Sequence, residues 1–277
     1  PRDAMQGIDE FIPTENKIRY INQLLKVGFD TIDFGSFVSP KVIPQMRDTA
    51  DVLRLLDIQD SETRLLAIVA NTRGAMEAAL FDSITYLGFP LSISETFQQR
   101  NTNMSITQAL NTLEGIKNLC VKEDKKLVTY ISMGFGNPYG DPYDIDLVAS
   151  FVDILLTLGS DIISIADTIG ASDSKHIYDL FTALSKRYPS VEFGLHLHAS
   201  PDTAGEKIKA ALTAGCRRLD GAIRGYGGCP MAKDDLVGNL ATETIIAMME
   251  QMGIKTTINY LEFQKALDMS GQIFPAH

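Results

Sequence analysis

The stretch Val191-Glu192-Phe193-Gly194-Leu195-His196-Leu197-His198 joins an apolar run to two histidines. Such a run is typical of a β-strand, in which side chains two positions apart point to the same side of the sheet. His196 and His198 are therefore predicted to face the same side, an arrangement that suits a divalent metal ion. The alternative is a pair of polar residues on a solvated strand face, because two imidazoles alone do not complete a coordination shell.

On both sides of this strand, apolar segments of strand and helix periodicity alternate along the chain. The predicted strands cover residues 31–34, 64–70, part of 84–92, 126–133, 161–167, 191–198 and 217–223. The predicted helices cover residues 15–27, 42–56, 73–81, 105–122, 144–158, 174–188, 204–214, 242–252 and about 260–272. Seven strands that are each followed by a helix favour a parallel sheet of the α/β class.

This alternation favours a TIM (β/α)8 barrel that lacks one strand, and we expect the first strand to lie upstream of Pro1. A doubly wound open sheet is the competing fold, but its Gly-x-Gly-x-x-Gly turn is absent from the first units. No Pro/Gly/Ser-rich linker divides the chain. Residues 1–277 are therefore predicted to form a single catalytic domain, with a short C-terminal helical extension from about residue 255.

Composition narrows the classes of partner. The chain has 25 Lys and Arg against 35 Asp and Glu, a formal charge of −10, which argues against nucleic acid or an anionic membrane as a partner. No apolar run approaches the roughly 20 residues of a membrane span. Three widely spaced cysteines suit a reducing compartment better than a disulfide framework. A local basic site for an anionic substrate remains compatible with this balance.

Polar residues are predicted where the strands end, which is where a barrel gathers its reacting groups. Asp33 and Asp167 each end a strand, as do His196 and His198, and Asn239 precedes the helix after the last strand. Arg2 and Asp3 would end the missing first strand. Each has a structural alternative, because Asp commonly caps a helix and Asn shapes turns, but several such residues on one rim favour a site.

The segment Arg224-Gly225-Tyr226-Gly227-Gly228-Cys229-Pro230 is the second informative stretch. Three glycines within four residues let the backbone approach a ligand closely, and Cys229 follows them outside any apolar run. A thiol at this place is a candidate proton donor. The alternative is a flexible surface loop with an incidental cysteine.

Several segments together resemble the hydroxymethylglutaryl-CoA lyase family, within a superfamily of metal-dependent barrel lyases and Claisen-type synthases. The resemblance runs in order over essentially the whole chain. Its segments are Pro1-Arg2-Asp3-Ala4-Met5-Gln6, Ser36-Phe37-Val38-Ser39-Pro40-Lys41, Pro44-Gln45-Met46, Asp167-Thr168-Ile169-Gly170, His196-Leu197-His198, Gly227-Gly228-Cys229-Pro230 and Gly238-Asn239-Leu240-Ala241-Thr242-Glu243.

The resemblance implies a divalent cation, Mg or Mn, held by Asp3, His196, His198 and Asn239. It implies that Arg2 stabilises an enolate oxygen, that Cys229 transfers a proton, and that Asp167 takes part in acid/base steps. Asp33 occupies a catalytic position at which the family usually has Glu, and Ala199 stands where an Asp often follows the histidine pair. The opening motif also departs from the family at Ala4, Met5 and Gly7.

The implied activity is cleavage of 3-hydroxy-3-methylglutaryl-CoA to acetoacetate and acetyl-CoA. The departures leave open a related acyl-CoA lyase, and a Claisen-type synthase or aldolase of the same superfamily is an alternative. A catalytically silent barrel that binds acyl-CoA or metal is a second alternative. The resemblance further implies a homodimer in the cytoplasm, or in the mitochondrial matrix if a targeting segment precedes Pro1.

Overall fold

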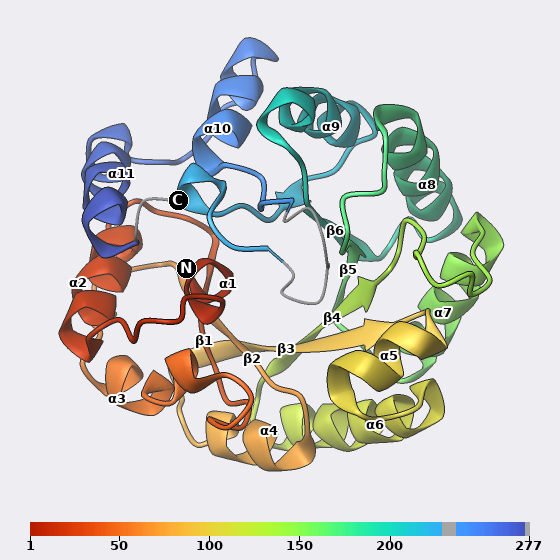
Figure 1. Cartoon of the computed structure of the whole chain (residues 1–277), viewed down its shortest axis with the longest axis horizontal. Coiled ribbons are helices and arrows are strands. Elements are labelled where there is room, and N and C mark those ends of the chain that lie inside the picture. The colour runs from red at the N-terminus through yellow and green to blue at the C-terminus, as the bar shows by residue number, and fades with distance from the viewer. Residues whose placement is uncertain (229–236, 275–277) are drawn as a thin grey trace.

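A computed structural model of the chain describes residues 1–228 and 237–274. Seven parallel strands form one curved sheet in the chain order β1-β2-β3-β4-β5-β6-β7, and helices surround it on the outside (Figure 1). The strands are β1 Thr31–Ser36, β2 Arg64–Ile68, β3 Ile84–Ser92, β4 Lys126–Ser132, β5 Ile162–Asp167, β6 Glu192–Leu197 and β7 Arg218–Leu219. The sequential order confirms the barrel-type α/β prediction and excludes the doubly wound sheet, whose strand order reverses.

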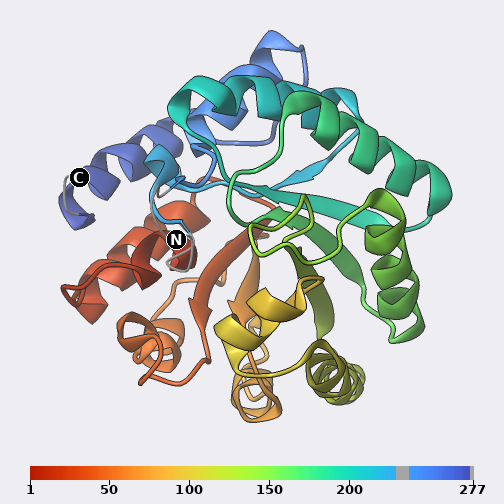
Figure 2. The same cartoon turned by 45° about the vertical axis from the view of Figure 1, so that its right-hand side comes forward.

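The helices alternate with these strands and lie against their outer face. Figure 2 shows α8 and α9 side by side along this outer layer. The described helices are α1 Arg2–Gln6, α2 Thr14–Leu25, η1 Pro44–Met46, α3 Thr49–Arg54, α4 Thr72–Ala79, α5 Glu95–Thr102, α6 Ile106–Lys122, α7 Ile145–Thr157, α8 Ser174–Arg187, α9 Pro201–Thr213, η2 Ile223–Gly225, α10 Thr242–Gln251 and α11 Tyr260–Ile273. Within the described ranges, no helix is long and apolar enough to cross a membrane.

The main core lies between the sheet and the helices, because the strands are covered on their outer face. β5 is buried at every position, and Leu87, Phe89 and Ile131 on neighbouring strands have no exposed surface. Buried apolar side chains of this size each contribute about 1.5–3 kcal/mol relative to their exposed state. The helices are also capped locally: Ser105 and Gln108 form a reciprocal capping box at the start of α6.

Several elements differ from the sequence-based prediction. Arg2 and Asp3, which were expected to end a missing strand, lie in the short helix α1, which was not predicted. The continuous helix predicted over residues 42–56 was wrong. It is a 3-10 turn, η1, followed by the short α3. Pro44 has no N–H and disfavours a helical conformation at Ile43, whose φ and ψ are −127° and 81°. The strand predicted over residues 217–223 shortens to β7, and the predictions missed α5.

The C-terminal helix α11 packs against α2 near the start of the chain (Figure 1). Gln23 donates a hydrogen bond to the backbone oxygen of Glu262 at 2.9 Å, and the rings of Tyr20 and Phe274 meet edge to face at 5.5 Å. α1, which carries the rim residues Arg2 and Asp3, contacts β1 and η1.

Candidate active site

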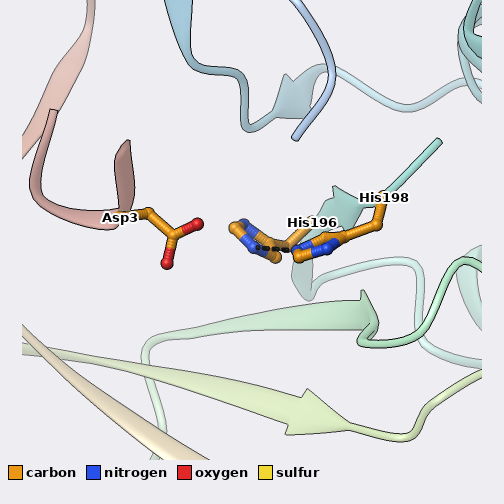
Figure 3. A group of neighbouring side chains, drawn as sticks. All are labelled: Asp3, His196 and His198. Atoms are coloured by element: carbon orange, nitrogen blue, oxygen red, sulfur yellow. Dashed lines mark hydrogen bonds between the residues drawn. The ribbon is translucent and has the colours of Figure 1, made fainter. Parts of the chain in front are cut away.

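Asp3, His196 and His198 converge at the ends of the strands (Figure 3). Asp3 lies on α1, His196 on β6 and His198 directly after β6. The three side chains each offer one ligand atom, and these atoms all lie within 4.8 Å of one another. The predicted histidine pair is confirmed as a pair on one side, because the Nε2 atoms of His196 and His198 are 3.2 Å apart.

The size and chemistry of this cluster fit a divalent cation. Donor atoms about 2.1 Å from an octahedral ion lie about 3.0 Å apart when adjacent and about 4.2 Å apart when opposite. Two imidazole nitrogens held 3.2 Å apart repel each other unless a proton or a cation lies between them. A carboxylate and two imidazoles are a donor set that such an ion accepts.

The electrostatics of the cluster favour an ionised aspartate. Burial disfavours the charge on Asp3, but Arg2 and His196 outweigh it and lower the pKa of the Asp3 carboxyl. Burial also disfavours charge on His196, but the hydrogen bond and charge of Asp220 raise its pKa. Burial and the charge of His196 lower the pKa of His198 to about 4, so His198 is a neutral imidazole at physiological pH.

Asn239, which follows the glycine-rich segment in the chain, contacts the same cluster. Its Nδ2 donates to Asp3 Oδ2 at 2.6 Å and to the backbone oxygen of Tyr226 at 2.9 Å, which leaves its amide oxygen for a further partner. Gly227, with φ +87°, lies so close that an added Cβ would be 2.7 Å from the Asp3 backbone oxygen. Gly227 therefore packs directly on the backbone of Asp3.

Arg2 lies beside Asp3 and is held by acidic groups. Its Nε and Nη2 donate to Asp33 Oδ2 at 3.0 and 2.6 Å, and its Nη1 donates to Asp3 Oδ1 at 2.8 Å. Gln6 accepts a further bond from Nη1 at 3.0 Å. Burial opposes the charge, but Asp33 and Asp3 raise the pKa of Arg2, so the guanidinium stays charged at the rim.

Asp167 ends β5 as predicted, but its carboxylate is engaged elsewhere. It accepts hydrogen bonds from the backbone N–H and the hydroxyl of Ser172 and forms an ion pair with Lys207 at 3.0 Å. Lys207 also donates to the backbone oxygen of His198 at 2.9 Å. Asp167 is therefore linked to the backbone of His198 only through Lys207, and it does not line the cavity beside the cluster.

A cavity of about 660 Å³ opens beside the cluster, within the range of small-molecule sites. Its polar walls include Arg2, Asp3, His196 and His198. Apolar side chains such as Val38, Ile43 and Phe11 also line it. Such a cavity can bind a substrate that has both an oxygen-rich end and an apolar portion.

Sequence reasoning missed two charged residues behind the site. Asp220 is 3.1 Å from the Nδ1 of His196, and the strand predicted over residues 217–223 concealed its place just after β7. Lys207 lies on the apolar stripe of α9 with Ala204 and Ala211, a position at which a lysine signals a buried partner. Tyr130 also lines the cavity and packs edge to face on His196 at 6.0 Å. Cys229, by contrast, was predicted as a site residue and lies outside the described residues.

The sheet and its rim of Arg, Asp, two His and Asn define a class: metal-dependent barrel enzymes that act on oxygen-rich carbon skeletons. The family model HMGL-like matches residues 1–269. A hydroxymethylglutaryl-CoA lyase of Bacillus subtilis is 38% identical over 93% of this chain and 85% of its own length, and the mitochondrial enzyme of Mus musculus is 32% identical over 97% and 82%.

Solved structures agree with these sequence relationships. The structure of an HMG-CoA lyase from Acinetobacter baumannii in complex with coenzyme A and 3-methylmalate has a TM-score of 0.91 and 30% identity, covering 99% of this chain and 88% of that one. The HMG-CoA lyase structure from B. subtilis also has a TM-score of 0.91, with 34% identity over 100% and 93% of the two chains. This chain belongs to the hydroxymethylglutaryl-CoA lyase family, a family of metal-dependent lyases.

Proposed function

We propose that this chain cleaves 3-hydroxy-3-methylglutaryl-CoA to acetoacetate and acetyl-CoA in a reaction that depends on a divalent cation. The observation that carries the proposal is the convergence of Asp3, His196 and His198 within 4.8 Å, with Arg2 beside them in one cavity. The relative from A. baumannii, crystallised with coenzyme A and a small hydroxy diacid, supports an acyl-CoA substrate.

Asp3, His196, His198 and Asn239 would hold the cation, which we propose to be Mg or Mn. Carboxylate, amide oxygen and imidazole donors suit both ions, and the cluster contains no thiolate. The cation, when bound, would supply a fixed positive charge that orients the oxygens of the substrate and polarises its hydroxyl group. Asp3 is an ionised carboxylate and His198 is a neutral imidazole, which are the ionisation states that a cation requires of its ligands.

Arg2 supplies the second positive charge. Cleavage of the carbon–carbon bond leaves an enolate on the thioester side, and a preorganised guanidinium at that oxygen lowers the barrier. Asp33 accepts hydrogen bonds from Nε and Nη2 of Arg2, so Asp33 acts by positioning the Arg2 guanidinium. A planar group fixed at two edges needs little reorganisation when charge develops.

Asp167 and Cys229 complete the proposed set. The burial of Asp167 and its bonds from Ser172 and Lys207 favour a positioning role for this carboxylate over direct proton transfer. Cys229 is proposed as the group that protonates the acetyl-CoA carbanion, on the strength of its place in Gly227-Gly228-Cys229-Pro230. Gly227, at the start of that segment, packs against the backbone of Asp3.

The direct test is an assay of the purified protein with Mg²⁺ or Mn²⁺ and a panel of 3-hydroxyacyl-CoA thioesters, with acetyl-CoA measured by mass spectrometry. We expect acetyl-CoA from 3-hydroxy-3-methylglutaryl-CoA, loss of activity with EDTA, and its return with added metal. His198→Ala is the matched control, because it removes one proposed ligand. Cleavage of none of the thioesters would overturn the lyase proposal, and condensation of acetyl-CoA with an oxo acid would favour a Claisen-type synthase.

The family relationship supports further features of this proposal. Residues 1–277 are proposed to act as one catalytic domain with a C-terminal helical extension, and the chain is proposed to form a homodimer, which light scattering would test. Its relatives include enzymes named mitochondrial and enzymes named cytoplasmic. A cytoplasmic or mitochondrial-matrix location is therefore proposed, and imaging of the tagged protein in its own cell would decide between them.

A further inference from the structure

Asp220 lies directly behind His196. Its Oδ2 is 3.1 Å from His196 Nδ1, the ring nitrogen that faces away from the cluster. The carboxylate is held in this place by the backbone, because Asp220 follows β7 and its N–H donates to the Leu195 oxygen at 3.0 Å. The edge-to-face contact of Tyr130 restrains the same imidazole from another side.

The partner of His198 shows what such a contact achieves. The Nδ1 of His198 is 3.2 Å from the backbone oxygen of Val237, and a carbonyl can only accept a hydrogen bond. Nδ1 of His198 must therefore carry the proton, which leaves Nε2 with its lone pair free in the neutral ring. A carboxylate is also an acceptor only, so Asp220 imposes the same tautomer on His196.

The two contacts therefore have one result. Both rings turn their Nε2 atoms toward the same point, 3.2 Å apart, and Asp3 offers its carboxylate there. Neither ring can act as a ligand through Nε2 in the opposite tautomer, because that nitrogen would then carry the proton. Asp220 is the only one of the two acceptors that a substitution can change, since the other is a backbone carbonyl.

We propose that Asp220 is a positioning residue that fixes the tautomer and orientation of His196 for the divalent cation. The inference rests on the proposed metal site. Asp220 touches neither substrate nor cation and acts through His196. A purely structural role, in which the contact only ties β7 to β6, is the competing explanation, and the two differ in what they predict for metal affinity and for the ring proton.

Asp220→Asn tests the proposal at nearly constant shape. The amide can present an N–H to His196 in place of an acceptor and so permits the opposite tautomer. Loss of a carboxylate behind a metal-ligating histidine typically weakens metal binding about 10- to 100-fold. We expect that loss in Mn²⁺ affinity measured by calorimetry, with an unchanged melting temperature for the metal-free protein.

Asp30→Asn is the matched control, because Asp30 pairs with Arg64 and Arg218 at the opposite end of the sheet and is not bonded to His196. Its Mn²⁺ affinity should equal that of the wild type. A second readout is the ¹⁵N spectrum of the histidine rings without metal, recorded at a pH at which His196 is neutral, in which His196 should carry its proton on Nδ1 in the wild type and show an altered tautomer in Asp220→Asn. Unchanged Mn²⁺ affinity together with an unchanged tautomer would overturn the proposal.

The two proposals fail separately. If the wild type binds no Mn²⁺, the metal site of the proposed function is wrong. The ring spectrum then still decides the inference, since an unchanged His196 tautomer in Asp220→Asn overturns it. If the wild type binds Mn²⁺ and Asp220→Asn binds it equally well with the tautomer unaltered, only the inference falls.

Discussion

Lys207 and Asp167 form an ion pair almost wholly removed from solvent: Nζ lies 3.0 Å from Oδ2, and the two side chains are 5% and 1% exposed. Nζ also donates to the backbone oxygens of Gly170 and His198. The ion pair thus joins α9 to the end of β5. The bond to His198 joins α9 to the end of β6, the strand of the histidine pair.

Lys207→Met should destabilise the protein severely. The substitution leaves the Asp167 carboxylate buried without its cation, a change that typically costs about 3–5 kcal/mol. Urea unfolding of the metal-free protein measures this as a lower midpoint. Lys209→Met on the same helix is the control, since Lys209 is exposed and its loss should stay within about 0.5 kcal/mol. Equal, small losses in both variants would show that the buried pair contributes little.

Arg2→Lys should remove most of the turnover and leave metal binding largely intact. Lysine keeps the positive charge. Its single nitrogen, however, cannot donate two hydrogen bonds to Asp33 and at the same time reach Asp3 and Gln6. We expect kcat to fall about 10²- to 10³-fold, the usual effect of losing a preorganised group at a developing oxyanion. Steady-state kinetics measures kcat, and calorimetry with Mn²⁺ serves as the control. Wild-type turnover in Arg2→Lys would exclude Arg2 from the chemistry.

Arg47 should recognise the phosphates of an acyl-CoA. Its guanidinium stacks on Phe11, 3.5 Å from the ring centroid, and lines the cavity. None of the ion pairs among the described residues involves Arg47, so its charge is available. Arg47→Gln should raise KM about tenfold or more with little change in kcat, because a hydrogen bond to a charged group contributes about 1.5–3 kcal/mol.

A truncated substrate provides the control for Arg47. The corresponding thioester of N-acetylcysteamine has no phosphates, so wild type and Arg47→Gln should show the same KM for it. The effect on the CoA thioester should also shrink as ionic strength rises. If Arg47→Gln changes KM equally for both thioesters, Arg47 acts by packing on Phe11 and does not bind the phosphates.

The strand-end rule explains how much of the site the sequence could predict. Asp167 and the histidine pair were located because parallel strands bring their C-terminal ends to one rim, and the structure has them there. Asp33 was also expected to end its strand, but that prediction was wrong, because β1 continues from Thr31 to Ser36 and Asp33 is its third residue. Asp220 obeys the same rule, yet it was missed because β7 has two residues where the sequence indicated seven. Asp220 and Gly221 are residue types depleted in strands, but the apolar residues Ala222 and Ile223 extended the predicted strand past them, and only the tertiary structure determines where pairing with β6 ends.

The partners in the buried ion pairs could not be predicted from the sequence, for a different reason. No recognisable motif connects Lys207 with Asp167, which lies 40 residues earlier in the chain. The apolar stripe of α9 marks Lys207 as buried, but the identity of its acid depends on how α9 lies on the sheet. The same holds for Arg2 and Asp33, which are 31 residues apart.

Alkaline pH should destabilise this protein through two buried thiols. Burial raises the pKa of Cys120 to about 11 and that of Cys216 to about 12, from an ordinary value of 9.0. Above that ordinary value the unfolded chain loses protons that the folded chain keeps, so the free energy of unfolding falls as pH rises. Each thiol contributes a slope of about 1.4 kcal/mol per pH unit in that window.

Urea midpoints between pH 8 and pH 10.5 measure this slope. Cys120→Ala should reduce it by the contribution of one thiol, because alanine has no proton to release, and the stability of this variant at pH 8 gives the separate cost of the lost sulfur. Thiol titration with a chromogenic disulfide should show both groups unreactive in the folded protein and reactive in urea. A slope that is the same in wild type and Cys120→Ala would mean that Cys120 ionises in the folded state at its ordinary pKa, and the packing of α6, which carries Cys120, against the sheet would then have to open at alkaline pH.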